Sequence, residues 1–133
     1  MTSYVIDTHA LVWYLENNPN LGNRAFAAMS DPGAELLIPA IALAEFCWIV
    51  RSGRTALADW RTCLSRLQTD PRFVVVPLDR DLIERAMKYP TDIEMHDAQI
   101  MAVTARHLEA HPKTVLLTRD LKIASTGLVP TIW

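Results

Sequence analysis

The sequence contains few of the residues that mark secreted, membrane-bound or nucleotide-binding proteins. Only two cysteines occur among its 133 residues, Cys47 and Cys63, and their spacing fits neither a zinc site nor a redox pair, so both are interpreted as packing residues in a reducing compartment. No apolar run is long enough to cross a bilayer without a charge, and no secretory signal is recognisable. A cytoplasmic protein without a membrane segment is therefore expected.

Positive charge is not in excess either. Thirteen lysines and arginines stand against 15 acids, which gives a formal net charge of −2, so the composition does not predict bulk attraction to nucleic acid. Any such binding must depend on a local patch or on bound cations. Half of the residues are hydrophobic, enough for a core without disulfides, and one domain spanning residues 1–133 is expected.

Short apolar runs alternate with helical patterns along the whole chain. The runs that predict strands are residues 4–6, 36–38, 73–76, 115–117 and 129–133, the last at a sheet edge because of its proline. The segments that predict helices are residues 8–15, 22–29, 40–50, 56–67, 79–89 and 98–108. This alternation is typical of a three-layer α/β/α domain with a central, mainly parallel sheet. Residues 40–50 are nearly all apolar and are expected to be buried on all sides.

Two of the predicted strands are followed by an acid. Asp7 comes directly after the run 4–6, and Asp120 comes three residues after the run 115–117. Because ligands of open parallel sheets bind beyond the carboxyl ends of the strands, both acids are candidate site residues. Capping of the next helix remains an alternative role for Asp7.

Two of the predicted helices supply further acids. Glu45 is the only charged residue of segment 40–50, where an isolated carboxylate needs a cation, hydrogen bonds or a proton, and pairing with a buried arginine is the alternative. Asp97 begins the helix 98–108 on the same side as Met101 and Ala105. A favourable interaction with the helix dipole would equally explain an acid there.

Convergence of these four acids would require a neutralising partner. Two carboxylates about 4 to 5 Å apart repel by roughly 3 to 4 kcal/mol at an effective dielectric near 20. Hard oxygen ligands favour Mg²⁺ or Mn²⁺, and such ions promote phosphate chemistry. The four acids therefore predict a divalent-metal site, unless protons neutralise them.

The segments around the four acids resemble those of PIN-domain endoribonucleases, and most of all the VapC-type toxins of toxin–antitoxin pairs. The matching segments are VIDTHAL at 5–11, AEF at 44–46, HDAQI at 96–100 and LTRD at 117–120. They follow the family's order of Asp, Glu, Asp and Asp over nearly the full chain. The resemblance implies metal-dependent hydrolysis of RNA phosphodiester bonds.

By the same resemblance, Asp7, Glu45, Asp97 and Asp120 bind one or two Mg²⁺ or Mn²⁺ ions. Thr118 would orient a carboxylate or a water beside them, although a strand-end hydrogen bond would explain it too. The resemblance also implies an antitoxin protein as partner and a homodimer.

Three arginines are predicted to contact RNA phosphates because they lie close to the acids in the sequence: Arg51, Arg54 and Arg119. Solvated surface arginines are the alternative interpretation. His9 and His96 adjoin the acids and are candidates for proton transfer.

Three other functions are alternatives to an active toxin. A PIN-like module could bind RNA or a partner without cleaving, but all four acids are present. A housekeeping RNA-processing nuclease would carry the same acids and stays open. A phosphotransfer domain would require a second aspartate two residues after Asp7 or a G-x-x-x-x-G-K-[ST] loop, and the sequence has His9 and no such loop.

Overall fold

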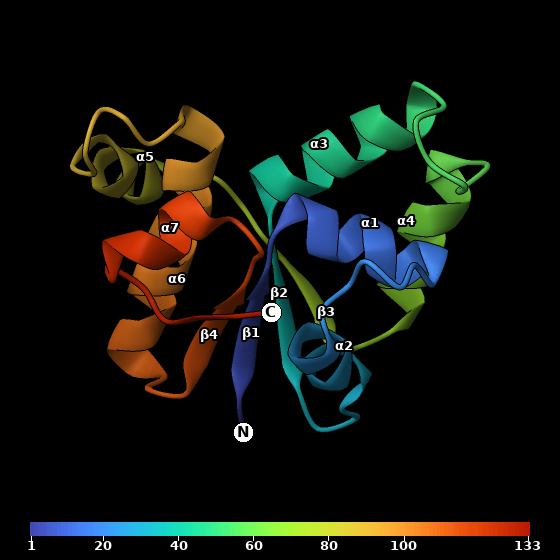
Figure 1. The fold of residues 1–133 in the computed structure, drawn as a ribbon, viewed down its shortest axis with the longest axis horizontal. Coiled ribbons are helices and arrows are strands. Elements are labelled where there is room, and N and C mark those ends of the chain that lie inside the picture. The colour runs from blue at the N-terminus through green and yellow to red at the C-terminus, as the bar shows by residue number, and fades with distance from the viewer.

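A five-stranded sheet organises the chain, and the computed structural model describes all of residues 1–133. All neighbouring strands are parallel, in the order β3-β2-β1-β4-β5 (Figure 1). The strands are β1 (Ser3–Ile6), β2 (Glu35–Pro39), β3 (Phe73–Val76), β4 (Thr114–Leu117) and β5 (Thr131–Ile132). The predicted α/β class with a mainly parallel sheet is confirmed.

The central strand, β1, sets the position of the first acid. Val5 and Ile6 are fully buried, as expected of a parallel strand that is covered on both faces. The register pairs Ile6 with Leu117 of β4. The next residues of the two strands, Asp7 and Thr118, therefore leave the sheet side by side at its carboxyl edge.

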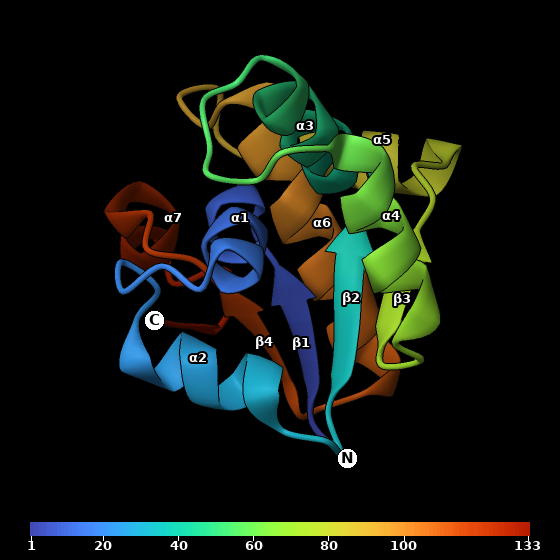
Figure 2. The same cartoon turned by 90° about the vertical axis from the view of Figure 1, so that its right-hand side faces the viewer.

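Helices cover both faces of the sheet. They are α1 (Thr8–Glu16), α2 (Asn23–Ser30), α3 (Ala40–Arg51), α4 (Trp60–Thr69), α5 (Arg80–Met87), α6 (Met95–Ala110) and α7 (Leu121–Thr126). Helices α1, α2 and α4 lie on one face and α5 and α6 on the other, while α3 extends from the carboxyl end of β2 (Figures 1 and 2). None of these helices combines the length and hydropathy that a bilayer crossing requires.

Helix α6 is the most deeply buried helix. Seven consecutive residues, from Ala98 to Thr104, are buried, because the helix contacts β1, β2 and β4 as well as α3 and α5. Such burial on all sides holds the helix in place. Its first turn, which carries Asp97, is therefore fixed at the carboxyl edge of the sheet.

The expected burial of residues 40–50 on all sides is wrong. Helix α3 buries only Ala42, Phe46 and Val50, which recur every four residues and form one stripe. Trp48 is 60% exposed. The helix packs through this stripe and through half-buried apolar residues beside it, and its remaining face is exposed, so its apolar composition overstates its burial.

Two helices depart from the predicted boundaries. Helix α4 begins at Trp60 and not at residue 56, because the Asp59 side chain caps it by accepting from Arg61 N at 3.1 Å. Helix α7 was not predicted. It is a single short helix that starts at the Asp120 cap and ends at Gly127, whose φ of +66° suits glycine.

Gly22 allows the start of α2 to approach the end of the chain. A Cβ built on Gly22 would lie 2.4 Å from the backbone carbonyl carbon of Trp133 and 2.6 Å from its indole Cδ1. No side chain fits in that space, so Trp133 can occupy its position only because residue 22 is glycine.

Gly22→Ala is expected to destabilise the protein by about 1 to 3 kcal/mol, because backbone atoms must move to admit the methyl group. The matched control is Gly33→Ala, where an added Cβ would meet its nearest atom at 3.5 Å. Urea denaturation of both variants measures the difference. Equal midpoints for the two variants would contradict the close approach.

Candidate active site

Asp7 lies between β1 and α1 and uses both of its carboxylate oxygens. Oδ1 accepts from the backbone N–H of Thr8 at 2.6 Å, and Oδ2 accepts from the hydroxyl of Thr118 at 2.6 Å. The first bond is the helix cap, and the second joins β1 to β4. Each oxygen keeps a second lone pair, so capping does not prevent Asp7 from binding a cation.

Asp120 stands on the other side of the same threonine. Its backbone N–H donates to Thr118 Oγ1 at 3.1 Å, and its own Oδ1 caps α7 by accepting from Lys122 N at 2.8 Å. Thr118 is 3% exposed, and its hydroxyl donates to Asp7 while it accepts from Asp120. The predicted orienting role of Thr118 corresponds to these two bonds.

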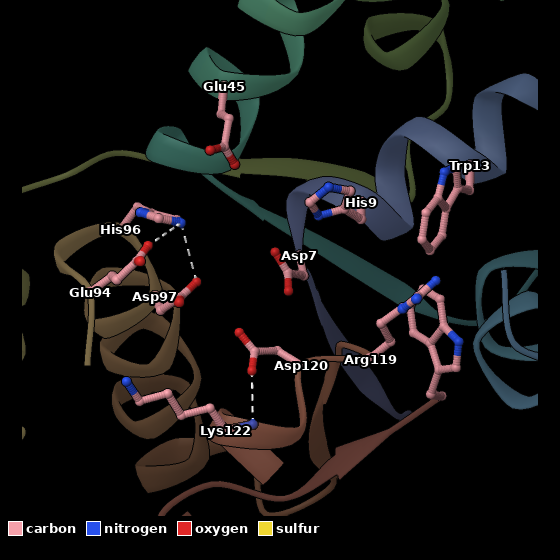
Figure 3. A pocket seen from close by; sticks show the side chains of 11 residues that line it. Asp7, His9, Trp13, Glu45, Glu94, His96, Asp97, Arg119, Asp120 and Lys122 are labelled. Atoms are coloured by element: carbon pink, nitrogen blue, oxygen red, sulfur yellow. Dashed lines mark hydrogen bonds and ion pairs between the residues drawn. The ribbon is translucent and has the colours of Figure 1, made fainter. Parts of the chain in front are cut away.

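Glu45 and Asp97 reach the same place from two helices. Figure 3 shows Glu45 extending from α3 toward Asp7, with Asp97 and Asp120 facing Asp7 from α6 and from the end of β4. No arginine or lysine forms an ion pair with any of these four acids. The structure therefore contradicts the alternative that Glu45 pairs with a buried arginine.

The four acids line one cleft of about 530 Å³. The other side chains that line this cleft are His9, Trp13, Glu94, His96, Arg119, Lys122 and Trp133. Nine of the 11 lining residues are therefore polar or charged, with acids near the centre of the cleft. The three lining residues whose ligand atoms all lie within 4.8 Å of one another are Glu94, His96 and Asp97, so the acidic group continues onto the start of α6.

Burial and mutual repulsion raise the pKa of two of these acids. The pKa of Asp97 rises to about 6, chiefly because the group is desolvated, and the negative charges of Asp7, Asp120 and Glu94 raise it further. His96, whose Nε2 lies 3.4 Å from Asp97 Oδ1, opposes that rise. The carboxylates are therefore held together at an electrostatic cost that a cation would relieve.

At Asp7, two hydrogen bonds oppose the effect of burial on the pKa. Burial raises the pKa of Asp7, and the hydrogen bonds from Thr118 and Thr8 lower it without cancelling the rise. Both bonds favour the ionised form, which is the form that binds metal. Oxygen donors without a thiolate among them suit Mg²⁺ or Mn²⁺.

The three predicted phosphate contacts lie in three different places. Arg119 lines the cleft, with its guanidinium carbon 5.2 Å from the centre of the Trp13 ring. Arg54 lines a neighbouring hollow of about 330 Å³ that shares His9 and Trp13 with the cleft. Arg51 lies over Trp48 at the end of α3 and does not line the cleft.

Two lining residues had not been singled out from the sequence. Lys122 lies in the unpredicted helix α7, and its Nζ donates to the backbone carbonyl of Asp92. Trp133 follows β5 and packs edge-on against Trp13, with the ring centres 5.7 Å apart. No local motif marks either residue: Lys122 lies two residues after Asp120, and only the tertiary fold brings Trp133 to the acids.

Comparison with known proteins identifies the architecture. The PIN domain family model matches residues 4–128. The chain belongs to the PIN domain family. No curated protein sequence matches this PIN domain, so the further comparisons are with solved structures.

The fold of this PIN domain is shared with chains of solved toxin–antitoxin complexes. A chain of VapBC2 from Rickettsia felis, bound to a DNA fragment from their promoter, has a TM-score of 0.68 at 16% identity, with 98% of each chain covered. FitAcB from Neisseria gonorrhoeae has a TM-score of 0.65 at 19% identity, with 98% of this chain and 96% of that chain covered. A chain of a toxin–antitoxin complex from Klebsiella pneumoniae has a TM-score of 0.66 at 19% identity, with the same coverage of both chains. The resemblance to VapC-type PIN domains that the motifs indicate is thus matched at the level of the fold.

Asp97→Asn is expected to stabilise the metal-free protein at pH 7.5 by about 1 to 2 kcal/mol, a value reduced for partial solvent screening. The pKa of Asp97 is raised from 3.8 to about 6 in the folded state, so ionisation above that pH opposes folding. The gain should therefore shrink as the pH falls below 6 and disappear near about pH 3, where the carboxyl is largely protonated in both states.

Urea denaturation in excess chelator at the two pH values measures this difference. The control is Asp31→Asn, since Asp31 is an exposed acid whose turn, closed by a bond from Gly33 N at 2.9 Å, asparagine can also form. An Asp97→Asn protein less stable than the parent at pH 7.5 would show that the acids do not repel one another as described.

Proposed function

We propose that the protein is a divalent-metal-dependent endoribonuclease and acts as the toxin of a toxin–antitoxin pair. The observation that carries this proposal is the meeting of Asp7, Glu45, Asp97 and Asp120 in one open cleft without a lysine or arginine ion pair. A structural charge cluster would be expected to contain its own counter-charges. A cluster of carboxylates without such counter-charges instead suits a site that binds cations.

The four acids would hold Mg²⁺ or Mn²⁺. A bound divalent ion supplies charge neutralisation for the phosphate and lowers the pKa of a water that can attack it. Asp7 offers a lone pair on each oxygen beyond its two hydrogen bonds, and Asp120 accepts hydrogen bonds only through Oδ1. Their ligand atoms are thus oriented before any ion arrives.

Thr118 keeps the two strand-end acids in position. Its hydroxyl donates to Asp7 and so favours the ionised carboxylate against the effect of burial. The same oxygen accepts from the Asp120 backbone and fixes the turn that leads into α7. Thr118 is therefore a positioning residue in the proposed reaction.

Cationic side chains beside the acids would receive the RNA backbone. Arg119 immediately precedes Asp120, Lys122 follows it by two residues, and both line the cleft, so they are suited to neutralise phosphate oxygens next to the bond that is cleaved. His96 lies against Asp97 and Glu94, with Nε2 at 3.4 and 3.6 Å from their oxygens. At that position it can hold or release a proton.

The partners proposed for this chain are an antitoxin protein and a second copy of itself. Support for the antitoxin comes from a structure that shares the fold and is described as a toxin–antitoxin complex. Support for the homodimer is limited to the apolar surface that the fold leaves uncovered, including Trp48 of α3 and Met87 of α5 at 60% and 63% exposure. The proposed toxin and its antitoxin would act in the cytoplasm, where the RNA substrates are.

RNA cleavage by the purified protein should require Mg²⁺ or Mn²⁺ and should stop in excess chelator. Asp7→Asn and Asp97→Asn should each lower the rate at least about a hundredfold, because each removes a negative charge that holds the ion through the transition state. The assay follows bulk cellular RNA on denaturing gels. Asp31→Asn, an acid outside the cleft, should leave the rate unchanged.

Cleavage that persists in chelator with both variants would overturn the proposal. Absence of cleavage by the parent with either metal would favour a binding module that no longer cleaves. Expression in a bacterial host separates the two nuclease roles: growth arrest by the parent but not by Asp7→Asn marks a toxin, whereas unimpaired growth with active enzyme marks an RNA-processing role.

Manganese should raise the thermal stability of the protein, because an ion that binds only the folded state stabilises it by about 2.7 kcal/mol at a hundred times its Kd. Asp7→Asn and Asp97→Asn should lose most of this gain, and Asp31→Asn should keep it. Thermal scans with and without manganese measure the effect. A gain of equal size in all four proteins would place the ion elsewhere.

A further inference from the structure

We propose that Trp13, Trp133 and Arg119 form a subsite for an unpaired RNA base next to the acids. The inference rests on the proposed ribonuclease function and adds what lies beside the phosphate that is cleaved. It assigns a recognition role to the aromatic end of the cleft, which the proposed chemistry does not use.

The three side chains form one connected cluster. Trp13 and Trp133 meet edge to face, with ring centres 5.7 Å apart and an interplanar angle of 66°. The Arg119 guanidinium lies over the Trp13 ring, 5.2 Å from its centre. His9 adds a tilted contact at 5.5 Å, so Trp13 is the member that touches all the others.

The cluster is directly connected to the acids. Asp7 caps the helix that carries Trp13, and six residues of α-helix span about 9 Å along the axis. Arg119 immediately precedes Asp120 in the turn after β4. Figure 3 shows Trp13 and Arg119 on the opposite side of Asp7 and Asp120 from His96 and Asp97. A strand whose phosphate lies at the acids would therefore place a neighbouring nucleotide at the cluster.

The composition of the cleft favours a base over an apolar peptide. Only 2 of its 11 lining residues are hydrophobic, and both are tryptophans. A peptide that docks through aliphatic side chains would need aliphatic partners, and no aliphatic residue lines the cleft. A base needs instead a flat aromatic face for stacking and a cation for the adjoining phosphate, which this cluster combines.

Arg119 is available for that phosphate. It forms no ion pair with any acid of the protein, although Asp120 is its neighbour in the chain. Its side chain is exposed at the surface of the cleft. Arginine combines stacking on aromatic rings with strong binding of phosphate, so it can bridge the base platform and the backbone.

The platform is held in place before any ligand binds. Trp133 fills the space left by the missing Cβ of Gly22, whose added Cβ would lie 2.6 Å from the indole Cδ1. Trp13 is half-buried in α1 and packs against the core. A rigid aromatic surface loses little conformational entropy on binding. Beyond Trp13, the hollow that contains Arg54 continues the cleft and offers a path for the strand.

The test is equilibrium binding of labelled single-stranded RNA by the full chain in magnesium buffer. The background is Asp97→Asn, which prevents cleavage in the proposed mechanism. Two probes of equal length are compared: a random-sequence pool of RNA and a strand of abasic riboses that has the same backbone but no bases. The pool is used because it includes every short sequence that the subsite could prefer.

Trp13→Leu should weaken binding of the base-bearing pool about fivefold or more, as expected for loss of one base–aromatic stack, and should change binding of the abasic strand less than twofold. The matched control is Trp60→Leu. Trp60 is also half-buried beneath an arginine, with the Arg61 guanidinium 4.3 Å from its ring centre, but it does not line the cleft. This control should bind both probes as the parent does.

Arg119→Gln is the second variant, since an exposed side chain without an ion pair is not needed for folding. It should weaken binding of both probes, because both carry phosphates. Unchanged binding of the pool by Trp13→Leu, or equal weakening of both probes, would overturn the subsite. If Trp13→Leu does not fold, unchanged binding by Arg119→Gln overturns it.

The two proposals fail in different ways. Metal-dependent cleavage by the parent, together with unaltered pool binding by Trp13→Leu, would leave the nuclease in place and remove the subsite. A parent that neither cleaves RNA nor binds the pool would remove both.

Discussion

Repulsion among carboxylates that the fold forces together is the constraint on which the rest of this structure depends. Asp7 and Asp120 are brought to one edge by the parallel register of β1 and β4, and Glu45 and Asp97 are added by α3 and the buried helix α6. A flexible chain would separate these charges. The packing of the hydrophobic core holds them together, so part of the folding free energy offsets their repulsion. A bound cation would relieve that repulsion.

Much of the fold could be predicted because its signals are local. The apolar runs around Val5 and Leu116 mark central strands, and parallel strands must deliver their carboxyl ends to one edge. The exposure of Trp48 could not be predicted in the same way, since an apolar helix has the same composition whether a sheet or solvent lies against it. Helix α7 was missed because six residues are too few to show a helical period.

The residues of the candidate site also divide into those with a local signal in the sequence and those without one. The four acids follow recognisable local segments, whereas Trp133 is brought to the cleft only by tertiary packing. Arg51 lies near an acid in the sequence but does not line the cleft. It follows Glu45 by six residues, which is about 240° around an α-helix at 3.6 residues per turn. Nearness in sequence therefore directs the arginine to a different face from the acid.

The hydroxyl of Thr118 has a consequence for how the site can move. Because one oxygen bonds both to the Asp7 side chain and to the Asp120 main chain, the ends of two strands form a single mechanical unit. Any displacement of β4 relative to β1 would shift both carboxylates together and leave their separation nearly constant. Glu45 and Asp97 stand on helices outside this linkage, so at the proposed metal site those two side chains would adjust most to ions of different radius.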